Sequence, residues 1–387
     1  MERSTIAMAT SVILLSGGLT AAAATRPVRV DCDAGGSINA TLAKLPRSGP
    51  NTLLVSGTCR EHVVVQAYDL LRIEGAPGAV LMPDVPSPLR HTLDISSSRA
   101  VVVTGLTIRP GPEIGIALTS CQDCAVERCR FEGSLEGSGV GVAVEESGFA
   151  RILDSSFVLS ASEVGGGVAV FVGDASAAKI GRCSLEAQVG WPGAWAGLMV
   201  MRNGSAVVWD STFRGFGVGM HLEAGGWVNL FRPPEHPGQG DSMVVVEHGN
   251  CGGIWIGQTA ELKSEATTRL RVKDSGPDCW ASGISMTGGS LALGGPVEIT
   301  NSVGPGLSLS GHSVARVTGG GTITGNALGV TLDADSLFVA ASIWTPGVPR
   351  LDLSGNGTGL ACDATSLVQN GAQIDGTDPG TCANIRP

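Results

Sequence analysis

A short tetrapeptide recurs along the chain and limits the folds that are open to it. It consists of glycine, an apolar residue, any residue and a second apolar residue. Ten copies begin at Gly115, Gly141, Gly167, Gly197, Gly219, Gly253, Gly283, Gly306, Gly329 and Gly359. Successive copies lie 22 to 34 residues apart. A period of this length is typical of a solenoid, a propeller or another repeat array.

A second phrase lies between these copies in the first half of the chain. It begins and ends on an apolar residue, as in Val126–Phe131, Ile152–Phe157, Ile180–Leu185 and Val208–Phe213. Each period therefore contains at least two short strands. Because side chains alternate between the two faces of a strand, both apolar positions of the tetrapeptide point one way and the residue between them points the other way.

Composition and repeat length exclude the other repeat folds. Glycine accounts for 57 of the 387 residues, and each glycine inside a helix costs about 1 kcal/mol. A propeller blade needs about 40 residues, and a leucine-rich repeat needs regularly spaced leucines. We therefore expect an all-β protein, a single-stranded right-handed parallel β-helix (solenoid) with an N-terminal cap.

The first part of the chain carries a family resemblance. It contains Cys32, followed by the runs Leu53–Cys59, His62–Val65 and Leu71–Gly75. This pattern resembles the start of exported bacterial proteins of the pectin-lyase-like superfamily. The resemblance implies right-handed parallel β-helix repeats and an N-terminal cap over the first coil. It is specific for the fold rather than for an activity.

The N-terminus predicts export. Arg3 precedes an apolar stretch at residues 6–19, and Ala22, Ala23 and Ala24 fit a cleavage site. We expect a signal peptide at residues 1–24, a cap at 25–60, the β-helix at 61–344, and a last coil with a disulfide-closed cap at 345–387. The protein is then secreted, periplasmic or at the cell surface, with no membrane span after cleavage.

The ten cysteines of an exported chain predict disulfides, although sequence does not fix their pairing. The repeat favours Cys32 with Cys59, Cys251 with Cys279 and Cys362 with Cys382, and Cys121 and Cys124 close a small loop. Cys129 and Cys183 occupy the same place in the second phrase as two serines. They lie two coils apart, beyond disulfide reach, so we expect two free, buried thiols.

The repeat offers no recognisable catalytic set. Polysaccharide enzymes on this fold need neighbouring outward carboxylates, and the residues between the apolar positions of the ten tetrapeptides include none. Arg271-Val272-Lys273 is similar to a polygalacturonase motif, but the chain has no Asp-Asp pair. We expect no cofactor and no metal.

Charge restricts the partners. The chain has 25 basic and 35 acidic residues and a net charge of −10. Because it contains no basic stripe, nucleic acid is not an expected partner. Acidic polysaccharides are repelled on average, although a local patch can override this repulsion.

The most distinctive local feature is aromatic, because six of the seven tryptophans lie between residues 191 and 280. Sugars pack their flat C–H faces on aromatic rings. We place a candidate carbohydrate groove here, with Trp255 beside His221 on the next coil. Its residues are Trp191, Trp195, His221, Glu223, Trp227 and Trp255. The alternative is that these tryptophans only seal loops against the outer wall.

These observations favour an exported interaction module at the cell surface or outside the cell, with polysaccharide as the candidate ligand. A polysaccharide lyase, hydrolase or epimerase with a degenerate motif set is the first alternative. A structural, adhesin-like surface protein is the second. The identity of the glycan and the oligomeric state stay open at this point.

Overall fold

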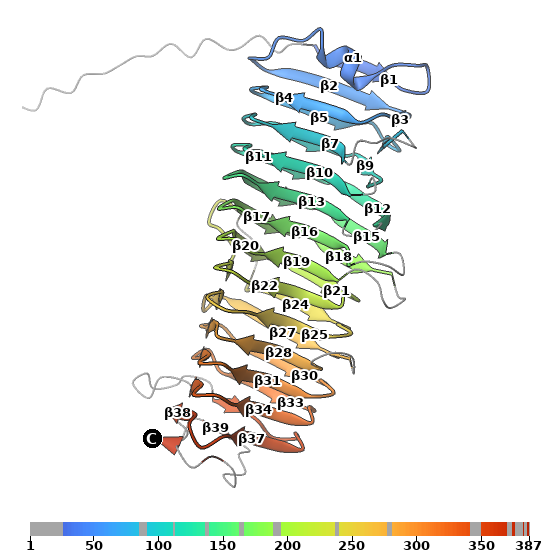
Figure 1. Cartoon of the computed structure of the whole chain (residues 1–387). Helices are drawn as coiled ribbons and strands as arrows, with labels where there is room; N and C mark the ends of the chain where they lie inside the picture. The colour runs from blue at the N-terminus through green and yellow to red at the C-terminus, as the bar shows by residue number, and fades with distance from the viewer. Residues whose placement is uncertain are drawn as a thin grey trace, which may run out of the picture.

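Strands three positions apart in the chain pair side by side, and their pairing is parallel. The computed structural model describes residues 26–84, 91–110, 113–135, 139–161, 166–188, 195–236, 240–276, 281–340, 350–369, 374–375, 382 and 385–386. In this part of the chain, each coil lies directly on the one before it (Figure 1). The predicted parallel β-helix is confirmed.

Three parallel sheets form the walls of the helix. Sheet A contains β1 (Val28–Asp31), β2 (Asn51–Ser56), β5 (Leu71–Gly75), β8 (Val102–Thr104), β11 (Cys124–Glu127), β14 (Phe149–Leu153), β17 (Ala177–Gly181), β20 (Ser205–Trp209), β23 (Trp227–Leu230), β26 (Glu261–Ser264), β29 (Ser290–Leu293), β32 (Val314–Val317), β35 (Leu337–Ala340), β38 (Leu367–Gln369) and β40 (Ile385–Arg386). Sheet B contains β3 (Thr58–Arg60), β6 (Val80–Met82), β9 (Thr107–Ile108), β12 (Arg130–Leu135), β15 (Ser156–Ala161), β18 (Ser184–Ala187), β21 (Ser211–Arg214), β24 (Ser242–Glu247), β27 (Thr268–Lys273), β30 (Val297–Thr300), β33 (Gly321–Thr324), β36 (Leu351–Asp352) and β39 (Ile374–Asp375). Sheet C contains β4 (Val63–Gln66), β7 (His91–Ser96), β10 (Ile114–Thr119), β13 (Val140–Glu145), β16 (Val168–Val172), β19 (Ala196–Val200), β22 (Val218–Leu222), β25 (Gly252–Ile256), β28 (Ser282–Thr287), β31 (Pro305–Ser310), β34 (Leu328–Leu332) and β37 (Thr358–Cys362).

The tetrapeptides lie on sheet C and stack in register. Their first apolar residues form an inward column that runs, for example, from Met220 to Ile254 to Ile284. These side chains are buried in the core of the helix. A short helix, α1 (Ile38–Leu42), lies against β4 at the N-terminal end, and its Ile38 and Leu42 are buried there.

One tetrapeptide departs from the predicted register. Ala143 pairs with Phe171 rather than with Ala169, so the copy at Gly167 is shifted by two residues. The strand Val168–Val172 is apolar at every position, and two reading frames fit the pattern equally well. Phe171 therefore occupies the outward column, where its neighbour on the next coil is Met199.

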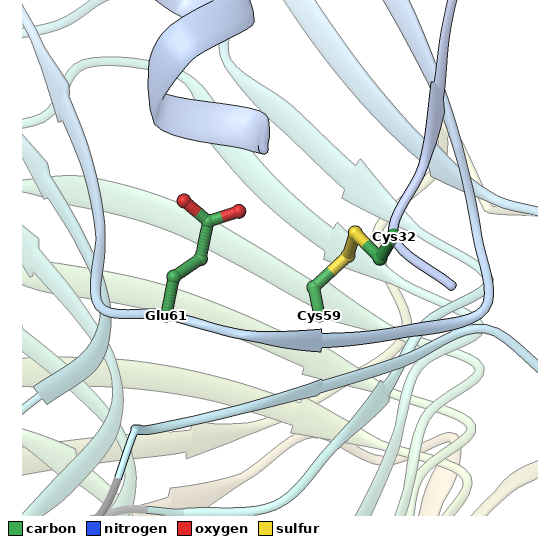
Figure 2. Close-up of side chains that lie close together, drawn as sticks. All are labelled: Cys32, Cys59 and Glu61. Carbon is green, nitrogen blue, oxygen red and sulfur yellow. A yellow bond between two sulfur atoms is a disulfide. The ribbon is translucent and has the colours of Figure 1, made fainter. Parts of the chain in front are cut away.

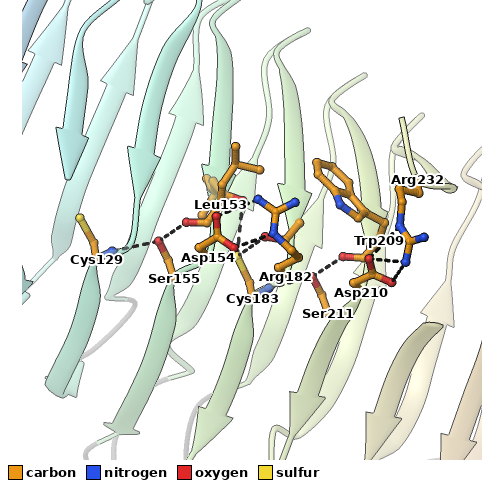
Figure 3. A network of polar contacts seen from close by, with 12 residues as sticks. Cys129, Leu153, Asp154, Ser155, Arg182, Cys183, Trp209, Asp210, Ser211 and Arg232 are labelled. Carbon is orange, nitrogen blue, oxygen red and sulfur yellow. Dashed lines mark hydrogen bonds and ion pairs between the residues drawn. The ribbon is translucent and has the colours of Figure 1, made fainter. Parts of the chain in front are cut away.

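The corner between sheets A and B is built from a repeated pair of residues (Figure 3). The first has left-handed backbone, with φ of 52° at Asp154 and 55° at Arg182. The side chain of the second residue points inward and forms hydrogen bonds with the backbone. The Ser155 hydroxyl accepts from Cys129 N on the previous coil at 3.2 Å and donates to Leu153 O at 2.9 Å. Equivalent residues of successive coils form a ladder of such side chains. This ladder satisfies backbone groups that the turn leaves unpaired.

The described cysteines either form disulfides or occupy positions in this ladder. Disulfides join Cys32 to Cys59, Cys121 to Cys124 and Cys362 to Cys382. Cys251 is also disulfide-bonded, while its expected partner, Cys279, lies outside the described residues. Cys129 and Cys183 are free and buried.

Among the described residues, no helix has the length and apolar character needed to cross a membrane. The predicted signal peptide at residues 1–24 lies outside them.

The two free thiols give a direct chemical test. Burial raises the pKa of Cys129 to about 11 and that of Cys183 to about 12, so neither forms thiolate near neutral pH. We expect a thiol reagent to react with no cysteine of the native protein and with two after denaturation without reductant. A different number of thiols in the denatured, unreduced protein contradicts the pairing.

A pair of stacked phenylalanines tests the core. The rings of Phe131 and Phe157 lie 4.4 Å apart and are nearly parallel, and both side chains are fully buried. We expect Phe157→Ala to lower the free energy of unfolding by about 3–5 kcal/mol. The measurement is urea denaturation. Val158→Ala, at the adjacent outward position, is the control and shifts the midpoint little; equal shifts contradict the assigned facing.

Candidate functional site

Three rings from successive coils stack on the outer face of sheet C. The centre of the His221 ring lies 4.3 Å from that of Trp195 and 4.2 Å from that of Trp255, with tilts of 47° and 45°. The structure thus places Trp255 beside His221 on the next coil. We call these three rings the ring stack.

The backbone holds both tryptophans in place. Trp195 immediately precedes β19, where its N–H donates to Gly167 O at 2.7 Å and its carbonyl accepts from Val218 N at 2.7 Å. The Trp255 indole lies over Gly257, because a Cβ at residue 257 would fall 2.9 Å from Cη2 of the indole. A residue with any side chain at 257 would push this ring away.

His221 is the buried centre of the ring stack, with a side chain only 4 % exposed. Its Nε2–H donates to Glu223 Oε2 at 3.2 Å. Its Nδ1 is buried and has no hydrogen-bond partner among the described residues. The imidazole therefore supports the two tryptophans from between them, and the surfaces open to a ligand belong to Trp195, Trp255 and Glu223.

Burial is the largest influence on the His221 imidazole and lowers its pKa, while the Glu223 carboxylate opposes that shift. The ring is consequently neutral near pH 7. The Glu223 side chain is 44 % exposed, so its carboxylate can accept hydrogen bonds from a ligand hydroxyl as well as from His221.

The other groove candidates do not all join the ring stack. Trp227 begins β23 on sheet A and pairs with Ser205 and Glu261, so it lies on a neighbouring wall. Trp191 lies outside the described residues.

Trp209 fits the sealing interpretation. It is fully buried, and its ring stacks on that of His236 at 5.2 Å. The segment that carries His236 is anchored by Arg232, which binds Asp210 in a bidentate ion pair (Figure 3). This tryptophan therefore attaches a loop to the wall of the helix.

An acidic pair, Glu145 and Asp174, lies at the corner that follows sheet C, on the two coils before that of Trp195. Arg202 Nε lies 3.2 Å from Asp174 Oδ1, and Arg202 Nη2 lies 3.8 Å from Glu145 Oε1. The guanidinium also lies 5.2 Å from the centre of the Phe171 ring. Burial, and then the nearby Asp174 carboxylate, raise the pKa of Glu145 above its ordinary value.

Sequence reasoning missed part of this corner. The tetrapeptide pattern did not include Asp174, because Asp174 belongs to a turn after β16 and not to a strand. It also omitted Asp94, which extends the outward column of Ala117 by one coil. The tetrapeptide glycine is absent from that coil, so the repeat alone did not align it.

The ligand atoms of Cys32, Cys59 and Glu61 lie close enough together to suggest a metal site (Figure 2). Their bonds assign them to structure instead. The two sulfurs form a disulfide, and the Glu61 carboxylate accepts from Ser37 Oγ at 2.8 Å and from Ile38 N at 2.6 Å. Glu61 thus binds the start of α1, and no thiolate is present for a metal.

No family model matches this chain, and no curated protein matches it. Among solved structures, it is similar to the pectin methylesterase PemA from Erwinia chrysanthemi (12 % identity, TM-score 0.37, 62 % of this chain and 81 % of that one). It is also similar to the Streptococcus pneumoniae surface protein and adhesin PfbA (9 %, 0.39, 88 % and 99 %). A third similar structure is the Dettilon tailspike protein (12 %, 0.43, 85 % and 61 %).

The buried imidazole makes stability depend on pH. Because the pKa of His221 is lower in the folded chain, the unfolded chain binds its proton first as the pH falls. We expect the stabilisation to be present above about pH 6.5 and to be lost below it. Urea midpoints at pH 8 and pH 5 measure the change.

The controls for this pH dependence are two histidine variants. His221→Gln removes the contribution of this imidazole to the pH dependence. The urea midpoint of this variant therefore changes less between pH 8 and pH 5 than that of the parent protein. His312→Gln, at a side chain that is 77 % exposed, retains this contribution. An unchanged pH dependence in His221→Gln would show that this ring is not the titrating group.

Proposed function

We propose that this protein is an exported interaction module that binds carbohydrate on the outer face of sheet C. The observation that carries the proposal is the ring stack, in which Trp195 and Trp255 are held on either side of buried His221. Rings fixed in this way lose little side-chain entropy when a ligand packs on them.

The chemistry of the site matches that of a sugar. Pyranose rings have apolar C–H faces and a rim of hydroxyls, and aromatic faces with a few polar groups beside them complement both. Trp255 supplies an indole face, and the half-exposed Glu223 carboxylate lies beside it as a hydroxyl acceptor. The disulfides at Cys32–Cys59 and Cys362–Cys382 support export, because such bonds persist in oxidising compartments.

Hydrolysis of the bound glycan is the second candidate, and the acidic pair favours it. Two neighbouring carboxyl groups, one of them with a raised pKa, are the arrangement of a general acid and its partner. Glu145 has the raised pKa, and Asp174 is its neighbour. Arg202 occupies the position between them, which favours binding over catalysis.

A glycan array with Trp255→Ala tests the binding function. We expect the parent protein to bind at least one glycan and the variant to lose at least about tenfold in affinity, the loss that a buried aromatic contact gives. Trp227→Ala, on the neighbouring wall, is the matched control and changes affinity less than about twofold.

Three results would contradict this proposal or change it. An array without signal removes carbohydrate binding and leaves the structural, adhesin-like alternative. Equal losses in both variants move the site away from the ring stack. New reducing ends in the same incubations, abolished by Glu145→Gln, assign hydrolysis instead.

A further inference from the structure

The strands of sheet C from His221 to the last coil carry no acidic or basic side chain other than this buried imidazole. The six strands β22, β25, β28, β31, β34 and β37 contain neither lysine nor arginine, and neither aspartate nor glutamate. The acidic residues at the corners that follow three of these strands are Glu223, Asp333, Asp335 and Asp363. A negatively charged ligand would meet repulsion at this edge and no compensating cation on the strands.

The carboxylate at the far end of this corner is held in its ionised form. Asp363 accepts hydrogen bonds from Ala334 N at 2.8 Å and from Ser366 N at 2.8 Å. Bonds of this kind hold the pKa of Asp363 below its ordinary value. The Asp363 carboxylate therefore stays negative at neutral pH.

Hydroxyl groups continue the outward column that contains His221 and Trp255. Trp255 pairs with Ser285, Ser285 with Ser308, and Ser308 with Thr331. All of these side chains are partly exposed. A hydroxyl both donates and accepts hydrogen bonds, and parallel strands are spaced by about 4.8 Å, which is close to the length of one pyranose unit along a glycan.

The outward cations beside these coils lie on the other two walls, for example Lys263 and Arg316 on sheet A and Arg214, Arg269 and Arg271 on sheet B. Arg214 binds Glu247, and Arg271 Nε lies 2.7 Å from Glu298 Oε2. A polyanion on the helix would therefore find its cations on a different wall, where carboxylates already bind Arg214 and Arg271.

We propose, on the basis of the carbohydrate-binding function above, that the ligand is an uncharged glycan that lies along the helix axis. One sugar packs on Trp255, and the following sugars hydrogen-bond to Ser285, Ser308 and Thr331. A polymer of uronic acids is excluded from this column by its carboxylates.

Titration calorimetry with hexasaccharides of equal length tests the charge of the ligand. The uncharged probes are cellohexaose, mannohexaose and N-acetylchitohexaose, and the charged probe is hexagalacturonate. We expect at least one uncharged probe to bind, with an affinity that changes less than about twofold between 50 and 500 mM NaCl. We expect hexagalacturonate not to bind at either salt concentration.

A steric block tests the position of the glycan. Ser308→Trp fills the middle of the hydroxyl column, and we expect it to weaken binding of the uncharged probe at least about tenfold. Ser184→Trp is the matched control, because Ser184 is exposed on sheet B. Circular dichroism checks that both variants keep the β-sheet signal.

The outcomes separate this inference from the proposed function. Binding of hexagalacturonate that Trp255→Ala abolishes keeps carbohydrate binding and overturns the uncharged ligand. An array signal that depends on Trp255, together with no binding of any uncharged hexasaccharide, also overturns it. Uncharged binding that Ser308→Trp leaves intact overturns the axial path. An array without signal removes the proposed function itself.

Discussion

The structure depends on in-register parallel pairing between successive coils. Each strand gives its backbone hydrogen bonds to the coil before and the coil after it, so a residue's neighbours in space are its equivalents about one repeat away in sequence. Register then determines which face a side chain occupies, because a slip of one residue reverses every position. The alternation of apolar and other residues in the tetrapeptides fixes that register through burial in a single continuous core.

Polar side chains at the corners complete the hydrogen bonding that strand pairing leaves incomplete. Backbone groups in a turn have no strand partner, and inward polar side chains of several coils bond them. The hydroxyls of Ser155 and Ser211 do this at one corner, and the amides of Asn326 and Asn356 do it at another. Cys129 and Cys183 fill equivalent places as small buried groups. The thiols therefore belong to the architecture rather than to chemistry.

The same stacking creates the candidate site on the outer wall. Because outward residues of successive coils come within contact distance, Trp195, His221 and Trp255 form one continuous surface although 60 residues separate the first from the last. The stack buries its own central ring, which gives His221 a supporting role and leaves the tryptophans and Glu223 to meet a ligand. The outward column that continues from Trp255 is uncharged, which is the property on which the inferred ligand depends.

The sequence by itself determined the fold and much of its interior. The ten tetrapeptides required stacked parallel strands, and their apolar positions identified inward side chains such as Met220 and Ile254. Equivalence within the second phrase also identified Cys129 and Cys183 as buried thiols. These features follow from a periodic pattern, because burial in a repeat depends only on position within one period.

Only the tertiary structure determined the positions of residues at which the repeat is irregular. It set the frame of Val168–Val172, in which Phe171 points outward. It brought Asp174 to Glu145 through Arg202, and it placed Trp227 on a different wall from Trp255. Corner lengths vary from coil to coil, so the spacing of the repeat does not determine the position of a turn residue or of a long side chain. Contacts between neighbouring coils settle that, and they exist only in the folded chain.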